Sequence, residues 1–128
     1  MSFSAQSIDH VEVFVRSIPD AIRWYGDVLG LKEMARWDPE PVMIGAGGTM
    51  LALFQAPEGS GPRPEAERPP LRWHRVAWRT DANGLERAME HLKSRSIPFR
   101  GPVDHDGPWS IYFQDPDGNL LEITTPSR

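Results

Sequence analysis

The sequence lacks cysteine, an excess of basic charge and long apolar runs, and each lack excludes a class of protein. With no cysteine among its 128 residues, it has no disulfide, no thiolate chemistry and no zinc site with thiolate ligands. Fourteen Lys and Arg against 18 Asp and Glu give a formal charge of −4, so we expect neither nucleic acid nor membrane as a partner. Apolar runs such as 50–54 are far shorter than the roughly 20 residues that cross a bilayer. Residues 1–7 have no basic region before an apolar core, which favours a cytoplasmic protein.

The remaining composition, 39% hydrophobic and 25% charged, is typical of one globular domain. The first half begins with valines at 11, 13 and 15 that alternate with other residues, the period of a strand. Ser17 and Asp20 then have the spacing of a helix cap, and Gly30 is a natural stop, which predicts a helix between them. Three extended segments follow, at 31–37, 41–45 and 49–55.

A proline-rich stretch, 56–70, separates the two halves. It contains five prolines and two glycines, which neither fill a core nor join a sheet. We interpret it as an exposed, semi-rigid linker; a functional lid is the alternative.

The second half repeats the order of the first. Val76, Trp78 and Thr80 alternate like the early valines, and Asp81 is a plausible cap for a second helix. Extended segments at 98–100, 109–114 and 119–125 follow, with a tight turn at 115–118. The repeat lies 65 positions after the original, which indicates an internal duplication. We therefore predict one α+β domain of two βαβββ modules, 8–55 and 71–126.

A helix that covers one face of each sheet leaves the other face open to a small molecule in a cleft. Strand alternation predicts which side chains lie on each face. The covered faces should hold Val11, Val13, Val15, Leu51, Leu53, Val76, Trp78, Ile111, Phe113, Leu121 and Ile123. The open faces should hold His10, Glu12, Phe14, Met50, Ala52, Phe54, Trp73, Arg75, Ala77, Arg79, Tyr112, Gln114, Leu120, Glu122 and Thr124.

Segments 8–15, 21–31 and 112–123 together resemble the vicinal oxygen chelate superfamily, which includes glyoxalase I, bleomycin-resistance proteins and extradiol dioxygenases. The resemblance covers essentially the whole chain. It implies a glyoxalase-like fold with a curved mixed sheet around a cleft, and a homodimer. It also implies action on a small oxygenated or aromatic metabolite, as a metal-dependent lyase, isomerase or dioxygenase. The alternative within the family is a metal-free, drug-sequestering binding protein.

The resemblance also suggests where a divalent metal (Fe, Mn, Ni or Zn) would bind. His10 and Glu122 fall at family ligand positions, whereas Ala52 offers no ligand at a third. At the second histidine position the chain has Arg75, whose guanidinium cannot bind a metal, and His74 lies one residue early. In a strand, a shift of one residue points the side chain to the opposite face of the sheet. His74 therefore becomes a ligand only if a β-bulge turns its side chain toward the cleft.

The other candidates each have two interpretations. Glu122 is either a catalytic metal ligand or an ion-pair partner of Arg75, and Arg75 could instead receive an anionic substrate. Tyr112 is a candidate for steadying a substrate oxygen. His105 is either a general base or a solvated turn residue. The aromatic residues either line a substrate pocket or simply fill the sheets, and they are Phe14, Phe54, Trp73 and Trp109.

Overall fold

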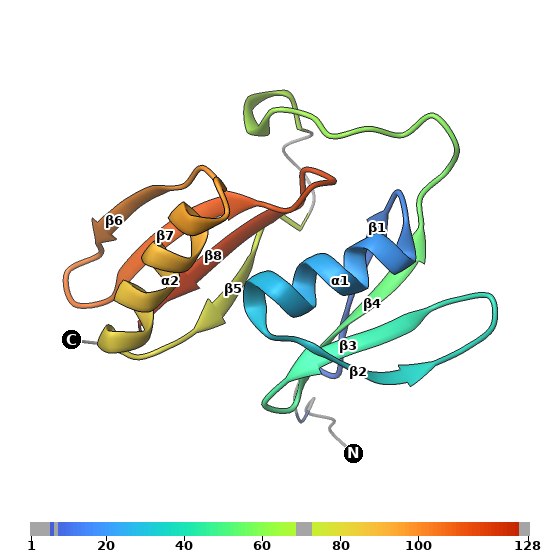
Figure 1. Ribbon diagram of the computed structural model, residues 1–128, viewed down its shortest axis with the longest axis horizontal. Helices are drawn as coiled ribbons and strands as arrows, with labels where there is room; N and C mark the ends of the chain where they lie inside the picture. The colour runs from blue at the N-terminus through green and yellow to red at the C-terminus, as the bar shows by residue number, and fades with distance from the viewer. Residues whose placement is uncertain (1–5, 7, 69–72, 126–128) are drawn as a thin grey trace, which may run out of the picture. The chain divides into compact units, whose positions relative to one another are not determined.

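The computed structural model describes residue 6, residues 8–68 and residues 73–125. The chain forms two compact units, 1–61 and 62–128, and their boundary lies within the proline-rich stretch. Each unit holds one four-stranded mixed sheet and one long helix, in the order β-α-β-β-β (Figure 1). The predicted α+β fold of two equivalent modules is thus confirmed, and the cleft stays a prediction.

Unit 1 has its sheet in the order β1-β4-β3-β2, with β1 parallel to β4 and the other pairs antiparallel. Helix α1 begins where predicted, because the Ser17 hydroxyl accepts a hydrogen bond from the Asp20 N–H at 3.3 Å. It ends at Gly30, whose φ of 70° suits glycine. The elements are β1 (Val11–Val15), α1 (Ile18–Leu29), β2 (Lys32–Arg36), β3 (Val42–Ala46) and β4 (Thr49–Gln55).

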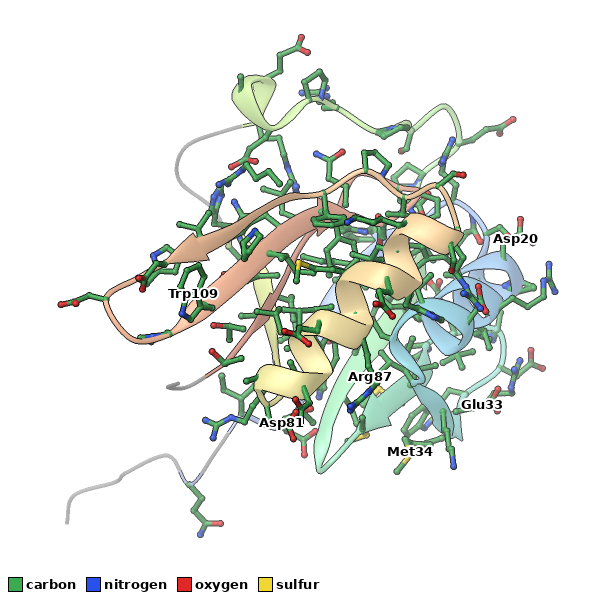
Figure 2. All side chains as sticks on the ribbon, turned by 60° about the vertical axis from the view of Figure 1, so that its left-hand side comes forward. Asp20, Glu33, Met34, Asp81, Arg87 and Trp109 are labelled. Carbon is green, nitrogen blue, oxygen red and sulfur yellow. The ribbon has the colours of Figure 1, made fainter. Side chains whose placement is uncertain are left out.

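Unit 2 repeats this arrangement as β5-β8-β7-β6, with β5 parallel to β8. The Asp81 carboxylate accepts a hydrogen bond from the Gly84 N–H at 2.7 Å and so caps α2, as predicted; Figure 2 shows Asp81 at the first turn. A short 3-10 turn, Glu65–Glu67, precedes the sheet. The other elements are β5 (Val76–Arg79), α2 (Ala82–Ser94), β6 (Arg100–Asp104), β7 (Trp109–Gln114) and β8 (Leu120–Thr124).

Strand β6 differs from the prediction, which placed it at 98–100. It begins at Arg100 and runs to Asp104, and its register with β7 shifts between Arg100 and Val103. The shift contains Gly101, at a φ of 112°, and Pro102, which cannot donate to a ladder. Because β6 is an edge strand, its irregularity leaves the rest of the sheet intact.

The helices lie on one face of each sheet, α1 against β4 and β2 and α2 against β8 (Figure 1). Seven of the eleven side chains predicted on the covered faces are buried, notably Leu51, Leu53, Ile111, Leu121 and Ile123. Burying these apolar faces drives the folding of each unit. Among the residues that the structure describes, no helix is long and apolar enough to span a membrane.

Candidate ligand-binding site

The open face of the unit 2 sheet carries a row of chemically different side chains. Register pairs Ala77 with Glu122, Glu122 with Tyr112, and Tyr112 with Arg100, across β5, β8, β7 and β6. Because facing residues of neighbouring strands share a face, this row lies opposite the face that α2 covers. The next row toward the end of the sheet pairs Gln114 with Leu120.

A pocket of about 460 Å³ opens at this end of the sheet. Its volume lies within the range of roughly 300–1,000 Å³ that is usual for small-molecule sites. All of its lining residues belong to unit 2. They are Glu65, Arg75, Pro98, Phe99, Arg100, Tyr112, Phe113, Gln114, Asp115 and Leu120. The pocket thus combines apolar walls with two cations, a phenol, an amide and two acids.

Tyr112 lies within range of both cations of the pocket. The Cζ atom of Arg75 is 4.7 Å from the centre of the Tyr112 ring, and that of Arg100 is 4.2 Å from it. Each cation–π contact of this kind contributes about 0.5–2 kcal/mol, depending on burial. One aromatic ring therefore helps to hold two like charges at the same pocket.

The acid that binds Arg75 is Glu65, from the 3-10 turn. Nη2 of Arg75 donates a hydrogen bond to Oε1 of Glu65 at 3.0 Å, and Nε2 of His74 lies 3.4 Å from the same oxygen. Within the described part of the chain, Arg75 forms no ion pair with Glu122, so that interpretation was wrong. No sequence pattern predicts the Arg75–Glu65 pair, because Glu65 lies in the proline-rich stretch, which has no strand or helix period.

His74 lies directly before β5, next to Arg75 in the chain. Its Nε2 is 3.2 Å from Nη2 of Arg75. The register between β5 and β8 continues without a bulge, and β5 begins at Val76, so strict strand alternation does not apply to the two residues before it. The role of His74 as a metal ligand stays a prediction.

The segment that carries Glu65 is anchored to the turn between β7 and β8. Nη1 of Arg68 donates to the carbonyl of Gly118 at 2.9 Å. Gly118 has a φ of 82°, and a Cβ there would lie 3.0 Å from Cβ of Pro62. This contact requires glycine, both for its backbone conformation and for the close approach. The predicted turn therefore also supports part of the pocket wall.

Tyr112 is oriented by the loop between β6 and β7. Its hydroxyl and Nε2 of His105 share a hydrogen bond of 2.5 Å, and the two rings meet edge to face at 89°. His105 is exposed to solvent, as predicted for a turn residue, but it also contacts the candidate site. The catalytic roles of Tyr112 and Glu122 stay predictions.

His10 lies in unit 1, directly before β1. Its Nδ1 is 2.8 Å from Oδ2 of Asp9, and its Nε2 is 3.3 Å from Oε2 of Glu12. The hydrogen bond with Asp9, and then that with Glu12, raise the pKa of His10 above its usual value. A metal at this imidazole would have to displace a proton, because only the neutral ring is a ligand.

The predicted aromatic residues are divided between the two units. Phe14 and Phe54 pair in register on β1 and β4 of unit 1, with ring centres 6.3 Å apart. Trp73 is 95% exposed and lies outside the pocket lining. Trp109, at the start of β7 (Figure 2), shares the covered face with Ile111 by alternation and does not line the pocket. Of the predicted substrate-binding residues, only Arg75 lines it.

The donor residues predicted for a divalent metal are divided between the two units, with His10 in unit 1 and His74 and Glu122 in unit 2. The part of the chain that the structure describes contains no group of three His, Asp or Glu side chains arranged to hold one. Glu122 has Ala77 and Tyr112 as its register neighbours, and Ala52 is a buried residue without a donor. The position of the expected second histidine carries the permanent cation of Arg75, which disfavours a metal ion nearby.

The comparisons with known proteins agree on one family. Residues 7–123 match the model of the Glyoxalase/Bleomycin resistance protein/Dioxygenase superfamily. A virulence protein of Salmonella typhimurium is 31% identical over 121 residues, which cover 91% of this chain and 82% of that protein. A metallothiol transferase of Staphylococcus saprophyticus is 30% identical over 94% of this chain and 77% of its own length. A biphenyl-2,3-diol 1,2-dioxygenase of Rhodococcus globerulus is 40% identical over 57% of this chain, which spans only 37% of that enzyme.

Solved structures give the same result. The crystal structure of a glyoxalase/dioxygenase from Nostoc punctiforme superposes with a TM-score of 0.83 and 27% identity, covering 100% of this chain and 99% of that one.

Proposed function

Because the chain belongs to the Glyoxalase/Bleomycin resistance protein/Dioxygenase superfamily, we propose that it binds a small oxygenated aromatic molecule in the unit 2 pocket without a metal ion. The observation that carries this proposal is the position of Arg75. Its guanidinium stands where the family resemblance places a metal-binding histidine, and it lies against Tyr112 at the pocket. Family membership alone does not decide the activity, since one fold hosts many functions.

The pocket chemistry suits such a ligand. Phe99 and Leu120 offer apolar surface for a ring, and the Gln114 amide and the guanidinium of Arg75 offer hydrogen bonds to oxygen. A guanidinium presents its N–H groups as a rigid planar fork, which fits two adjacent oxygens. It can thus hold a pair of ligand oxygens by hydrogen bonding where a metal would hold them by coordination.

Replacement of Arg75 tests the proposal. Calorimetric titration of chelator-treated protein with benzoate, benzamide and catechol should detect binding of at least one probe. Arg75→Gln should weaken that binding about 10- to 100-fold, because hydrogen bonds to charged groups are worth about 1.5–3 kcal/mol. Arg79→Gln is the matched control, since Arg79 is an exposed arginine at the end of the adjoining strand β5 and lies outside the pocket lining. The proposal is wrong if no probe binds or if the two variants behave alike.

The alternative is a metal-dependent enzyme with His10, Glu122 and His74 as ligands, which the metallothiol transferase relative favours. Mass spectrometry of protein purified without chelator tests it. Near-stoichiometric metal that is lost in His10→Ala and Glu122→Ala would favour this alternative over our proposal. The homodimer that the resemblance implies also stays a prediction, and light scattering tests it.

A further inference from the structure

We infer that the pocket selects a ligand with a carboxylate group, and that Glu65 is a built-in competitor that occupies the ligand's place on Arg75. This inference rests on the proposed function and adds to it the chemical class of the ligand. The 3-10 turn lies in the proline-rich stretch, which we interpreted from its composition as a linker. Its first residue nevertheless places a carboxylate at the guanidinium that lines the pocket.

The Arg75–Glu65 contact has the geometry of an exchangeable carboxylate. The Arg75 side chain is only 12% exposed and is held against Tyr112, whereas Glu65 is 43% exposed. A single oxygen of Glu65, Oε1, accepts the hydrogen bond from Nη2. Arg75 is therefore the fixed partner, and the more exposed Glu65 side chain is the one that can move into solvent.

The charges of the pocket favour an anion once Glu65 has left. The lining contains two cations, Arg75 and Arg100, and two acids, Glu65 and Asp115. Asp115 is already engaged, because Oδ1 accepts hydrogen bonds from the N–H groups of Asp117 and Asn119 at 2.8 Å each. In the described part of the chain Arg100 forms no ion pair. Displacing Glu65 therefore leaves two guanidinium groups facing a ligand without a nearby free acid.

An uncharged ligand would leave Arg75 paired with Glu65, because it cannot take the place of the Glu65 carboxylate. It could not replace the charge of the Glu65 carboxylate, so binding at Arg75 would leave one buried cation less well stabilised. A ligand carboxylate restores the pair and can add a second, parallel hydrogen bond from the guanidinium fork. The pocket should therefore discriminate between a carboxylate and its neutral amide.

Displacement of Glu65 requires little rearrangement. The turn itself stays anchored through Arg68, whose Nη1 donates to the Gly118 carbonyl, so only the Glu65 side chain needs to turn toward solvent. Ion pairs with an exposed partner contribute weakly to stability. Glu65 should accordingly reduce carboxylate affinity by about two- to fivefold rather than block binding.

Glu65→Gln tests the inference, with Glu67→Gln as the matched control because Glu67 is an exposed acid of the same turn that does not line the pocket. Benzoate and the neutral benzamide are titrated into each protein, and the side-chain Nε–H signal of Arg75 is followed by NMR. We expect Glu65→Gln to bind benzoate about two- to fivefold more tightly than wild type and Glu67→Gln to match wild type. The Arg75 signal should shift with benzoate in every case.

The outcomes separate this inference from the proposed function. If benzamide binds as tightly as benzoate, or if Glu65→Gln leaves benzoate affinity unchanged or lowers it, the inference is wrong while the pocket remains a binding site. If neither benzoate nor benzamide binds wild type or Glu65→Gln, the inference is wrong, and the proposed function fails with it when catechol does not bind either. An Arg75 signal that does not move during saturable benzoate binding would place the ligand elsewhere and likewise overturn both.

Discussion

The turn at the end of the pocket is held by one buried acid, Asp115. The variant Asp115→Ala should show how much this carboxylate contributes to the unfolding free energy. Asp115 is 5% exposed. Its Oδ1 accepts hydrogen bonds from the Asp117 and Asn119 N–H groups, and its Oδ2 accepts one from Nδ2 of Asn119, each at 2.8 Å. Truncation leaves three donors without this acceptor in a part-buried turn.

The expected loss follows from the number of bonds and from their burial. A hydrogen bond to a charged group contributes about 1.5–3 kcal/mol, but three bonds to one carboxylate are not additive, so we expect Asp115→Ala to lower the unfolding free energy by about 2–4 kcal/mol. Asp104 provides a matched control. Its carboxylate accepts from the Asp106 and Gly107 N–H groups at 2.9 and 3.3 Å, but it is exposed, so Asp104→Ala should lose less than about 1 kcal/mol.

Urea unfolding of both variants, followed by fluorescence and circular dichroism, measures the difference. Hydrogen exchange of the Asn119 amide should accelerate in Asp115→Ala before global unfolding, since its acceptor is removed. Asp115→Asn keeps one acceptor oxygen and should lie between wild type and Asp115→Ala. Equal losses of unfolding free energy in Asp115→Ala and Asp104→Ala would show that burial does not determine how much such a carboxylate stabilises its turn.

Three further predictions concern single groups. The pKa of His10, followed by NMR, should lie above its usual value and fall in Asp9→Asn; protonated His10 stabilises the fold at pH below its unfolded pKa, and this is lost as pH rises through the folded pKa. An unshifted pKa would contradict the two carboxylate contacts. Gly118→Ala should lower the unfolding free energy by about 1–3 kcal/mol and speed cleavage after Glu67 by a glutamate-specific protease, because a side chain at 118 meets both a positive φ and the preceding segment. Unchanged cleavage would argue against that contact. Tyr112→Phe should bind benzoate nearly as wild type does, whereas Tyr112→Leu should lose about threefold or more with the ring; equal losses would assign the effect to the hydroxyl.

The fold was predictable because its signals are local. The period of two before Ser17, the cap at Ser17 and the stop at Gly30 each act within a few residues, and the second module repeats them. Where a local rule is broken, the prediction was less exact. Strand β6 has Gly101 and Pro102 inside it, and residues of that kind are typical of turns rather than strands.

The candidate site was only partly predictable. Tyr112 follows from alternation, since it lies on the open face of β7, and Arg75 follows from its position 65 residues after His10 in the internal repeat. Glu65 does not, because its contact with Arg75 joins a stretch without a period to a residue ten positions later. Likewise the ring of Tyr112 brings together Arg75 and Arg100 through pairing between strands, which sequence separation does not reveal.

The most direct test of the account measures benzoate affinity in chelator-treated protein, and again after addition of manganese, nickel, zinc or ferrous iron. We expect the same affinity with and without each metal, and a loss of affinity in Arg75→Gln. Binding that appears only with a metal, and that disappears in His10→Ala and Glu122→Ala while Arg75→Gln retains it, would contradict the account.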